Sequence, residues 1–388
     1  MAKTKLLIIA DDFTGGLDTG VQFAKLGISV QIVMEGLEET RWTDSAAEIL
    51  VVVTETRHMT PKDAYDTVLR IVSQGVAAGI PHVYKKTDSA LRGNPGAELA
   101  AALHAGEGEM LSFIPAYPAM NRITVDGTHY IDGTPVSESA FGKDPLNPVT
   151  SSDVLEVLSS QTETPLYNTD PDHIRSIEGI LVINAKSDQD MKHAGERLKE
   201  IGALKIMAGC AGFASILPEL LNLHQTGRTV LPQLGDSLTV ICGSINPITL
   251  RQLDHAEKHG FCRVHLPAGH LPELTLPQSE KWLLVDDPAG IDAGTETERQ
   301  VYLARLADAF GKLIMSREGI VLLTGGDTLM ACLRHIGVRR IVPLLELFPG
   351  VVLSRIQTAG SERLIISKSG GFGDETLITD LRKIMTEG

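Results

Sequence analysis

The stretch that decides the fold is Leu6-Leu-Ile-Ile-Ala10, which runs directly into Asp11-Asp12-Phe13-Thr14-Gly15-Gly16. A continuous apolar run of this length, ended by acids and glycines, is typical of a buried parallel strand. The apolar positions Leu17, Val21 and Ala24 follow at helical spacing. Together these segments predict the first strand and the first helix of an α/β unit.

Asp11 and Asp12 fall at the carboxyl end of this strand, where open parallel sheets bind their ligands. A single Asp in such a turn would be explained as the N-cap of the following helix. Two adjacent acids are poor strand formers, and this favours a functional site over a cap alone.

The composition limits both the size of the fold and the class of partner. A chain of 388 residues predicts two domains, and its net charge of −14 argues against nucleic acid or an anionic membrane as a partner. The four cysteines contain no C-x-x-C pair, so neither a disulfide framework nor a zinc site is expected. Because no signal-peptide pattern or run of ~20 apolar residues is present, we expect a cytoplasmic protein.

Strand-like runs alternate with amphipathic helical stretches such as Lys62–Gly75 and Asp188–Ile201. This alternation predicts an α/β fold with a mainly parallel sheet flanked by helices. The expected strands are Leu6–Ala10, Val30–Met34, Ile49–Thr54, His82–Tyr84, Met110–Ile114, Gly179–Ile183, Lys205–Ala208, Leu238–Cys242, Cys262–Leu266, Trp282–Val285, Gly319–Thr324, Gly350–Val352 and Leu364–Ser367.

Three further segments organise the chain. Residues 224–237 are rich in turn formers, so we expect two such α/β domains, 1–228 and 229–388, with a cleft between them. Val125–Pro135 breaks the α/β rhythm and predicts a hairpin outside the main sheet. The apolar run Ile341–Leu353 is expected in the core rather than at an interface.

The second half contains three places where a strand runs into glycines beside a Ser or Thr. Backbone N–H groups and helix N-termini at such junctions can bind an anion. One junction is usually only a tight turn, but three in one domain favour the phosphates of a nucleotide. No G-x-x-x-x-G-K-[ST] or G-x-G-x-x-G pattern is present. The junctions are Cys242-Gly243-Ser244, Thr324-Gly325-Gly326-Asp327-Thr328 and Lys368-Ser369-Gly370-Gly371-Phe372-Gly373.

The first half has a complementary polar set after its third, fourth and fifth expected strands. Lys86 and Arg92 are suited to an anionic substrate, and Asp88 could accept a proton from a substrate hydroxyl. Arg57 could add a further cation from the end of the strand before. Arg122 follows the prolines of Pro115–Pro118 and is a weaker candidate, because those prolines could simply shape a loop.

Motifs in both halves of the chain resemble those of the four-carbon acid sugar kinase family. The motifs occur in the expected order over nearly the whole chain, and their combination is specific. Residues 245–247, Ile-Asn-Pro, depart from the Cys-Ser expected there. The motifs are ADDFTGGLDTG at 10–20, TETR at 54–57, YKKTDSALRGN at 84–94, PAYP at 115–118, CGSINPIT at 242–249, TGGDT at 324–328 and KSGGFG at 368–373.

The resemblance implies a sugar-acid-binding N-terminal domain and a nucleotide-binding C-terminal domain. It implies that ATP with Mg²⁺ phosphorylates the terminal hydroxyl of threonate, erythronate or 3-oxo-tetronate. The implied roles are Asp12 and Asp88 in catalysis; Asp11, Arg57, Lys86 and Arg92 on the substrate; Ser244, Gly325, Gly326, Asp327, Thr328, Gly370, Gly371 and Gly373 on ATP; and Asp327 also on the metal.

Two other functions stay open from the residues alone. One is a sugar-acid dehydrogenase or lyase, and the other is a two-domain sensor that binds a sugar acid without turnover. A sensor needs no phosphate-binding loops, so the three glycine junctions count against it. Which acid is used, which Asp is the general base, and whether the chain forms a homodimer are not determined at this level.

Overall fold

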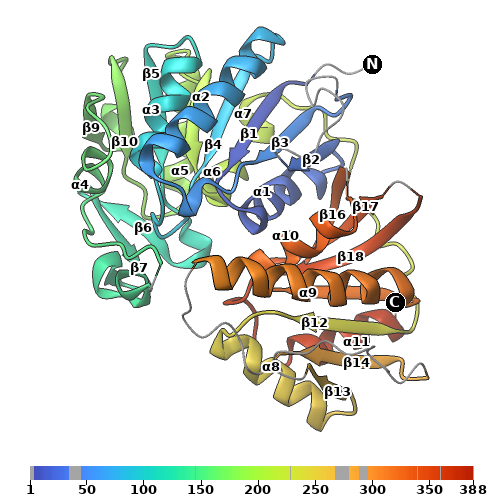
Figure 1. The fold of residues 1–388 in the computed structure, drawn as a ribbon. Helices are drawn as coiled ribbons and strands as arrows, with labels where there is room; N and C mark the ends of the chain where they lie inside the picture. Colours follow the sequence, from blue (N-terminus) through green and yellow to red (C-terminus); the bar gives the residue numbers. More distant parts are fainter. Residues whose placement is uncertain are drawn as a thin grey trace. The chain divides into compact units, whose positions relative to one another are not determined.

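The computed structural model describes residues 4–34, 45–144, 146–227, 229–266, 279–287, 296–338, 340–358 and 360–387. The chain divides into two compact units, Met1–Arg228 and Thr229–Gly388 (Figure 1). Both units are α/β, as the sequence predicts. Among the helices described, none combines the length and apolarity needed to cross a membrane.

The first unit is built on a parallel sheet of order β2-β3-β1-β4-β11-β5-β10-β9. Its strands are β1 Leu6–Ala10, β2 Val30–Met34, β3 Ile49–Val53, β4 His82–Lys86, β5 Met110–Ile114, β9 Leu166–Thr169, β10 Gly179–Ile183 and β11 Ile206–Gly209. Its helices are α1 Phe13–Ala24, α2 Pro61–Ala77, α3 Pro95–Ala105, α4 Val154–Ser159, α5 Asp188–Glu200, α6 Ala211–Ala214 and α7 Leu217–Leu220.

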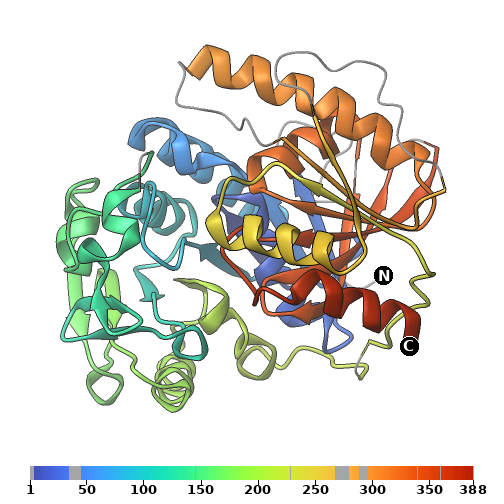
Figure 2. The ribbon, with the colours of Figure 1, turned by 90° about the horizontal axis from the view of Figure 1, so that it is seen from below.

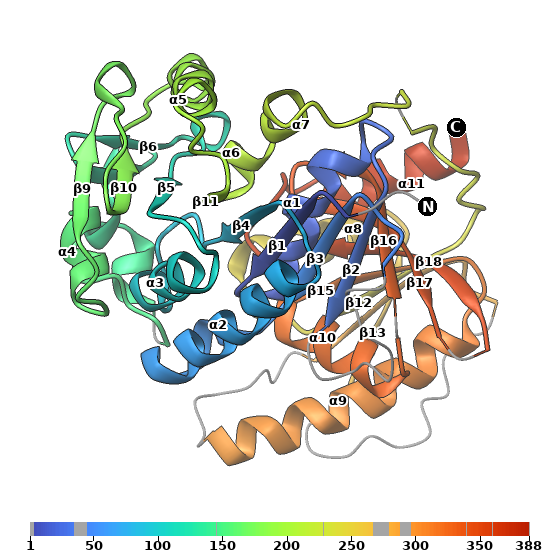
Figure 3. The same ribbon diagram turned by 90° about the horizontal axis from the view of Figure 1, so that it is seen from above.

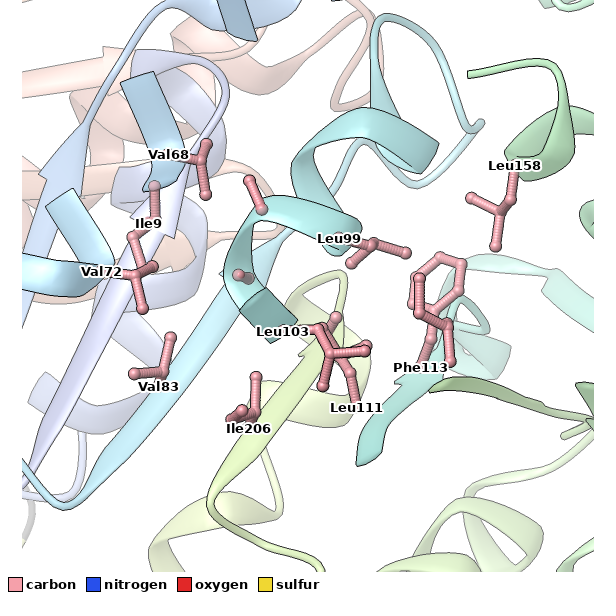
Figure 4. Close-up of a cluster of buried hydrophobic side chains, with 14 of the residues drawn as sticks. Ile9, Val68, Val72, Val83, Leu99, Leu103, Leu111, Phe113, Leu158 and Ile206 are labelled. Atoms are coloured by element: carbon pink, nitrogen blue, oxygen red, sulfur yellow. The ribbon is translucent and has the colours of Figure 1, made fainter. Parts of the chain in front are cut away.

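Helices pack on both faces of this sheet because its central strands are apolar on both sides. Gly16 of α1 faces Val51 and Val53, whereas Gly75 of α2 faces Leu7. Figure 3 shows α2 and α3 side by side, and Figure 4 shows the core beneath them. Each large apolar side chain buried there contributes about 1.5–3 kcal/mol. The core includes Ile9, Val68, Val72, Val83, Leu99, Leu103, Leu111, Phe113, Leu158 and Ile206.

The predicted hairpin is confirmed as a small antiparallel sheet of β6 Arg122–Val125, β7 Thr128–Ile131 and β8 Thr134–Pro135. Its two turns, Asp126-Gly127 and Asp132-Gly133, have φ values of 49°, 76°, 50° and 77°. Two consecutive positive φ values define the type I′ turn, which Asp-Gly accommodates well.

The second unit has the sheet order β13-β14-β12-β15-β18-β17-β16, parallel from β13 to β18 and antiparallel beyond. Figure 2 shows α8 and α11 on one face of this sheet and α9 on the other. The strands are β12 Leu238–Cys242, β13 Cys262–His265, β14 Trp282–Asp286, β15 Ile320–Thr324, β16 Arg340–Phe348, β17 Val351–Gln357 and β18 Glu362–Lys368. The helices are α8 Pro247–Lys258, α9 Glu296–Ser316, α10 Gly326–His335 and α11 Leu377–Glu387.

Two strands were missing from the sequence prediction. β9 lies at the sheet edge and is only half buried, so its apolar signal is weak. β16 contains Pro343, which argues against a strand in sequence alone. The run Ile341–Leu353 is the β16–β17 hairpin, and its Val351 and Leu353 belong to the core, as expected.

In the described part of each unit, the strand order reverses at a switch point, and the loops singled out in the sequence lie there. The chain leaves β1 toward β2 on one side of the sheet and leaves β4 toward β5 on the other. In the second unit the chain leaves β12 and β15 in opposite directions in the same way. Ligands of open α/β sheets bind at such points, beyond the carboxyl ends of the strands.

Candidate functional site

Asp11, Asp12, Arg57, Asp88 and Arg92 come together at the β1/β4 switch point of the first unit. Ala10 and Lys86 are register partners in neighbouring strands, so the residues after them leave the sheet at the same level. Arg57 arrives from the short 3₁₀ helix Thr56–His58 that follows β3. The sequence predicted all five as site residues, and the structure brings them into one cluster.

Arg57 joins the three carboxylates of this cluster. Its Nε lies 2.7 Å from Asp11 Oδ2, and its second terminal nitrogen lies 2.9 Å from Asp12 Oδ1 and 3.4 Å from Asp88 Oδ2. Burial works against its charge, but the three acids outweigh burial and raise the pKa of Arg57 well above its usual range. Arg57 is therefore a permanent cation that holds the acids together.

Asp12 is both a helix cap and the most accessible acid of the three. It caps α1 by accepting a hydrogen bond from the Gly15 N–H at 3.0 Å, and the Thr14 hydroxyl donates to it at 2.7 Å. Burial favours its neutral form, but Arg57 and Lys86 prevail and lower its pKa. With 24% of its side chain exposed, Asp12 is an ionised acceptor that a ligand can reach.

Asp88 is instead enclosed by donors. The Arg92 guanidinium binds both of its oxygens, and the Ala90 N–H donates to Oδ1 at 2.9 Å. Burial would raise its pKa, but Arg92 and Arg57 lower it well below the usual range. Leu91, inside this tight turn, is buried with a φ of 66°, a strained conformation for a branched side chain.

Lys86 lies behind Gly15 and close to Asp12. A Cβ atom on Gly15 would overlap Asp12 Oδ1 and lie 2.9 Å from Lys86 Nζ, so a larger residue here would displace these two side chains. The Lys86 ammonium donates to the Thr87 carbonyl at 2.7 Å. Two buried polar atoms here, Asp11 Oδ1 and Thr87 Oγ1, have no hydrogen-bond partner, as expected where a ligand supplies it.

Lys85 and Glu98 form a second, buried ion pair next to the cluster, and the sequence analysis did not predict it. Lys85 Nζ lies 3.1 Å from Glu98 Oε2, and both side chains are buried. The Thr56 hydroxyl also donates to Glu98. Glu98 lies on α3 among alanines and leucines, and an acid on so apolar a helix is the signal that could have revealed it.

In the second unit the three glycine junctions converge at the β12/β15 switch point. Cys242, Thr324 and Lys368 are register partners across β12, β15 and β18, so the three loops leave the sheet together. A Cβ atom on Gly243 would overlap Thr328 Oγ1, and one on Gly370 would lie 2.8 Å from Ser244 Oγ. The predicted loops are therefore in contact with one another.

Two helix N-termini open toward these loops. Gly325, with a φ of 104°, turns the chain from β15 into α10, and its Cα faces the Gly243–Ser244 backbone. Asp327 lies in the first turn of α10. Asn246 caps α8 by accepting from the Ile248 N–H at 2.9 Å, and its own N–H donates to Ser244 Oγ at 3.2 Å. Such termini carry partial positive charge that favours a phosphate.

Lys368, at the end of β18, is a site residue that the prediction omitted. Its buried ammonium donates to Thr249 Oγ1 at 3.0 Å, to the Ser369 carbonyl at 3.0 Å and to the Gly370 carbonyl at 3.2 Å. Burial lowers its pKa to about 8. It fastens the Gly370 loop to α8 and adds positive charge beneath it.

Gln252 of α8 binds the end of the glycine loop that follows β18. Its amide nitrogen donates to the carbonyls of Phe372, Gly373 and Asp374 at 2.9–3.0 Å, which places Gly373 at the base of the loop. Gly371 has more free space around it: a Cβ atom there would make one contact, 3.7 Å from Asn246 Nδ2.

This arrangement fits the phosphates of a nucleotide. Glycines remove side chains from the loop surface, two helix N-termini face it, and a buried lysine lies below it. The Thr324 hydroxyl at this edge is buried without a hydrogen-bond partner. Among the described residues no cluster of His, Cys, Asp or Glu is able to hold a metal ion by itself. Asp327, in the first turn of α10, is the carboxylate that the sequence analysis assigns to Mg²⁺.

Comparisons with known proteins match each half of the chain to a separate family model. A family model described as a sugar-binding N-terminal domain matches residues 6–217, and one described as a nucleotide-binding C-terminal domain matches residues 284–378. The protein therefore belongs to a class that joins a sugar-binding and a nucleotide-binding domain. It is a member of the four-carbon acid sugar kinase family, which confirms the resemblance seen in its motifs.

Individual relatives extend over almost the whole chain. A D-threonate kinase from Salmonella typhimurium is 30% identical, with 97% of each chain covered. A 3-oxo-tetronate kinase from Burkholderia multivorans is 26% identical, with 94% of each chain covered. A solved Salmonella typhimurium LT2 structure, provisionally described as a tRNA synthase, has a TM-score of 0.81 over 99% of this chain and 100% of its own. At 19% identity, that likeness shows the fold alone.

Proposed function

We propose that the protein is an ATP-dependent kinase that phosphorylates the terminal hydroxyl of a four-carbon sugar acid. Threonate, erythronate and 3-oxo-tetronate are the candidate substrates. The observation that carries the proposal is the contact among three glycine loops above Lys368, at the switch point of the unit whose relatives bind nucleotides. The names of full-length relatives support the same activity.

Asp12 is the residue we assign to the attacking hydroxyl. Its carboxylate is ionised, and 24% of its side chain is exposed, whereas only 8% of the Asp88 side chain is exposed. Phosphoryl transfer depends mainly on positioning and electrostatics, so a carboxylate of low pKa suffices to orient the hydroxyl and receive its proton. Asp88 and Arg92 instead hold Arg57 and the loop that follows β4 in position.

The second unit binds ATP in this proposal. Backbone N–H groups of the Gly243, Gly325 and Gly370 loops and the charge of Lys368 stabilise the phosphates. Ser244, Thr328, Gly326, Gly371 and Gly373 complete the loops predicted to contact ATP. Asp327 is the carboxylate that we assign to Mg²⁺, which when bound neutralises charge on the β- and γ-phosphates.

The test is an ADP-release assay with Mg·ATP and a panel of four-carbon sugar acids, with an acid-free control. Turnover with one acid and none in the control supports the kinase and names its substrate. A reduced-nicotinamide signal with the same acids would instead support a dehydrogenase. Acid binding without ATP binding, measured by calorimetry, would support the sensor and overturn the proposal. A homodimer remains a separate prediction, which sedimentation of the purified protein checks.

A further inference from the structure

Two cations at the first-unit site, Arg57 and Arg92, are already paired with the protein's own acids. Arg57 binds Asp11, Asp12 and Asp88, and Arg92 binds Asp88 and Asp144. Removing either guanidinium from these acids to receive a ligand would leave buried carboxylates without a counter-charge, which is strongly destabilising. The carboxylate of a sugar acid therefore needs another partner.

Arg122, the first residue of β6, has the properties required of that partner. Its guanidinium donates to the Ser89 hydroxyl, one residue beyond Asp88. No carboxylate of the described part of the chain forms an ion pair with it, and its Nε is buried without an acceptor. Its Cζ lies 5.5 Å from the centre of the Phe141 ring, and Arg92 Cζ lies 5.1 Å from the same ring. Arg122 thus lies next to the Asp88 loop, and its Nε–H group is available to donate to a ligand.

The small antiparallel sheet fixes both Arg122 and Ser89 in place. His129 of β7 is fully buried, with Nε2 2.9 Å from the Ser89 carbonyl and Nδ1 3.0 Å from the Thr124 hydroxyl. A carbonyl only accepts, so Nε2 carries the proton and Nδ1 accepts from Thr124. Burial, assisted by the Arg122 charge, lowers the pKa of His129 to about 4. His129 is neutral at pH 7, and Arg122 supplies the positive charge on this side.

Lys86 provides a second cation from the neighbouring strands. Gly209 of β11 is the register partner of Lys86, the last residue of β4, and of Ile114, the last residue of β5. Cys210, which follows Gly209, therefore lies between the end of β4 and the end of β5, the strand whose following loop leads to Arg122. Burial raises the pKa of the Cys210 thiol, and the charges of Lys86 and Arg122 oppose that rise, in keeping with this register. Asp12 lies close to Lys86, because a Cβ atom on Gly15 would lie 2.4 Å from Asp12 Oδ1 and 2.9 Å from Lys86 Nζ.

We propose that Arg122, assisted by Lys86, binds the carboxylate of the substrate and makes the enzyme specific for sugar acids over neutral sugars. The inference rests on the proposed function and deepens it. The proposal also assigns a function to the small antiparallel sheet of β6, β7 and β8, because Arg122 is the first residue of β6. Arg122 recognises the end of the substrate remote from Asp12, where the hydroxyl reacts.

The experiment compares the wild type with Arg122→Ala and Arg122→Lys, with Arg197→Ala, an exposed arginine paired to Glu200, as the matched control. Each is assayed with the acid that the ADP-release panel identifies and with the neutral amide of that acid. Arg122→Ala should raise KM for the acid about 10- to 100-fold, the value of a lost charged hydrogen bond, and leave KM for ATP unchanged. Its KM for the amide should change little, so the preference for the acid disappears.

Calorimetric titration of the acid without ATP separates this inference from the proposed function. Turnover in the wild type with an unchanged acid preference in Arg122→Ala overturns the inference and leaves the kinase intact. Acid binding without turnover, weakened in Arg122→Ala, overturns the kinase and supports the inference. If the wild type neither binds nor turns over any acid, both fail. Should Arg122→Ala unfold, Arg122→Lys, which keeps the charge but loses the two-nitrogen fork, must show an intermediate preference.

Discussion

Arg92 holds Asp88 with two nitrogens, Nε at 3.1 Å from Oδ1 and a terminal nitrogen at 2.9 Å from Oδ2. Arg57 also reaches both oxygens of Asp12, at 3.1 Å and 2.9 Å, but it is shared with Asp11 and Asp88, and Asp12 is the more exposed acid. The same residue type therefore performs two tasks in one cluster. Asp88 fixes the loop, and Asp12 remains accessible to a substrate.

Replacing Asp12 by Asn should lower kcat by a factor of about 10²–10⁴ while the fold is retained. Asn keeps an oxygen that can accept from the Gly15 N–H and is itself a good N-cap, so α1 loses the charge but not its cap. Steady-state kinetics and thermal unfolding measure the two effects. An unchanged kcat would remove Asp12 from the mechanism.

Replacing Asp88 by Asn should mainly reduce stability, by about 3 kcal/mol, because Arg57 and Arg92 lose a buried counter-charge. Since the pKa of Asp88 is lowered by folding, its contribution is present above the unfolded value of about 3.9 and is lost as the pH falls through the folded value. The difference in unfolding free energy between wild type and variant should therefore shrink below about pH 4. Urea denaturation across this range measures it. Asp66→Asn, at an exposed pair, is the control, and equal effects of the two variants would contradict this role.

Replacing Gly243 by Ala should weaken ATP binding and leave sugar-acid binding unchanged. The new methyl group would overlap Thr328 and force the first two glycine loops apart, a packing conflict that typically costs about 1–3 kcal/mol. KM for ATP should rise about 10-fold or more. Gly360→Ala is the control, because nothing lies within 4 Å of that position. Equal KM values for ATP in the two variants would show that the loop contact is not part of the nucleotide site.

Lys368 should make ATP affinity fall as the pH rises through about 8, the pKa to which burial lowers this amine. Deprotonation removes the charge and one of the three donors that hold the Gly370 loop. Stability has the opposite sign: the folded state loses this proton before the unfolded state does, so stability increases between about 8 and the ordinary value of 10.5.

Calorimetry with ATP between pH 7 and 9 tests this, with Lys368→Met and the exposed Lys312→Met as its control. The wild type and Lys312→Met should lose affinity with rising pH, whereas Lys368→Met should bind weakly at every pH. The same pH dependence in all three proteins would assign the titration to another group.

The local order of the chain could be predicted well from sequence, because strand and helix formation depend on the spacing of neighbouring apolar residues. The run Leu6–Ala10 needs only its own side chains to identify a buried strand. The Asp12 turn and the glycine junctions were likewise visible, since turns are formed by consecutive residues. β9 and β16 were missed where that local signal is weak.

The partners of the charged residues could not be predicted, because they are brought together by the order of strands in the sheet. Arg57 meets Asp11 across 46 positions, and Lys368 meets Thr249 across 119. Sequence motifs alone assigned Arg92 to the substrate and rated Arg122 lower. The tertiary structure pairs Arg92 with Asp88 and leaves Arg122 without a carboxylate among the described residues.

By itself, the sequence determined the family and the α/β character of both halves, and it identified the loops for which we propose a function. These properties follow from short patterns and from the order of motifs along the chain. Only the tertiary structure decided which acid is most accessible, which cations are already paired with acids, and that the buried Lys368 supports the Gly370 loop. Burial and pairing depend on distances between residues far apart in the chain, and those distances exist only once the sheets have formed.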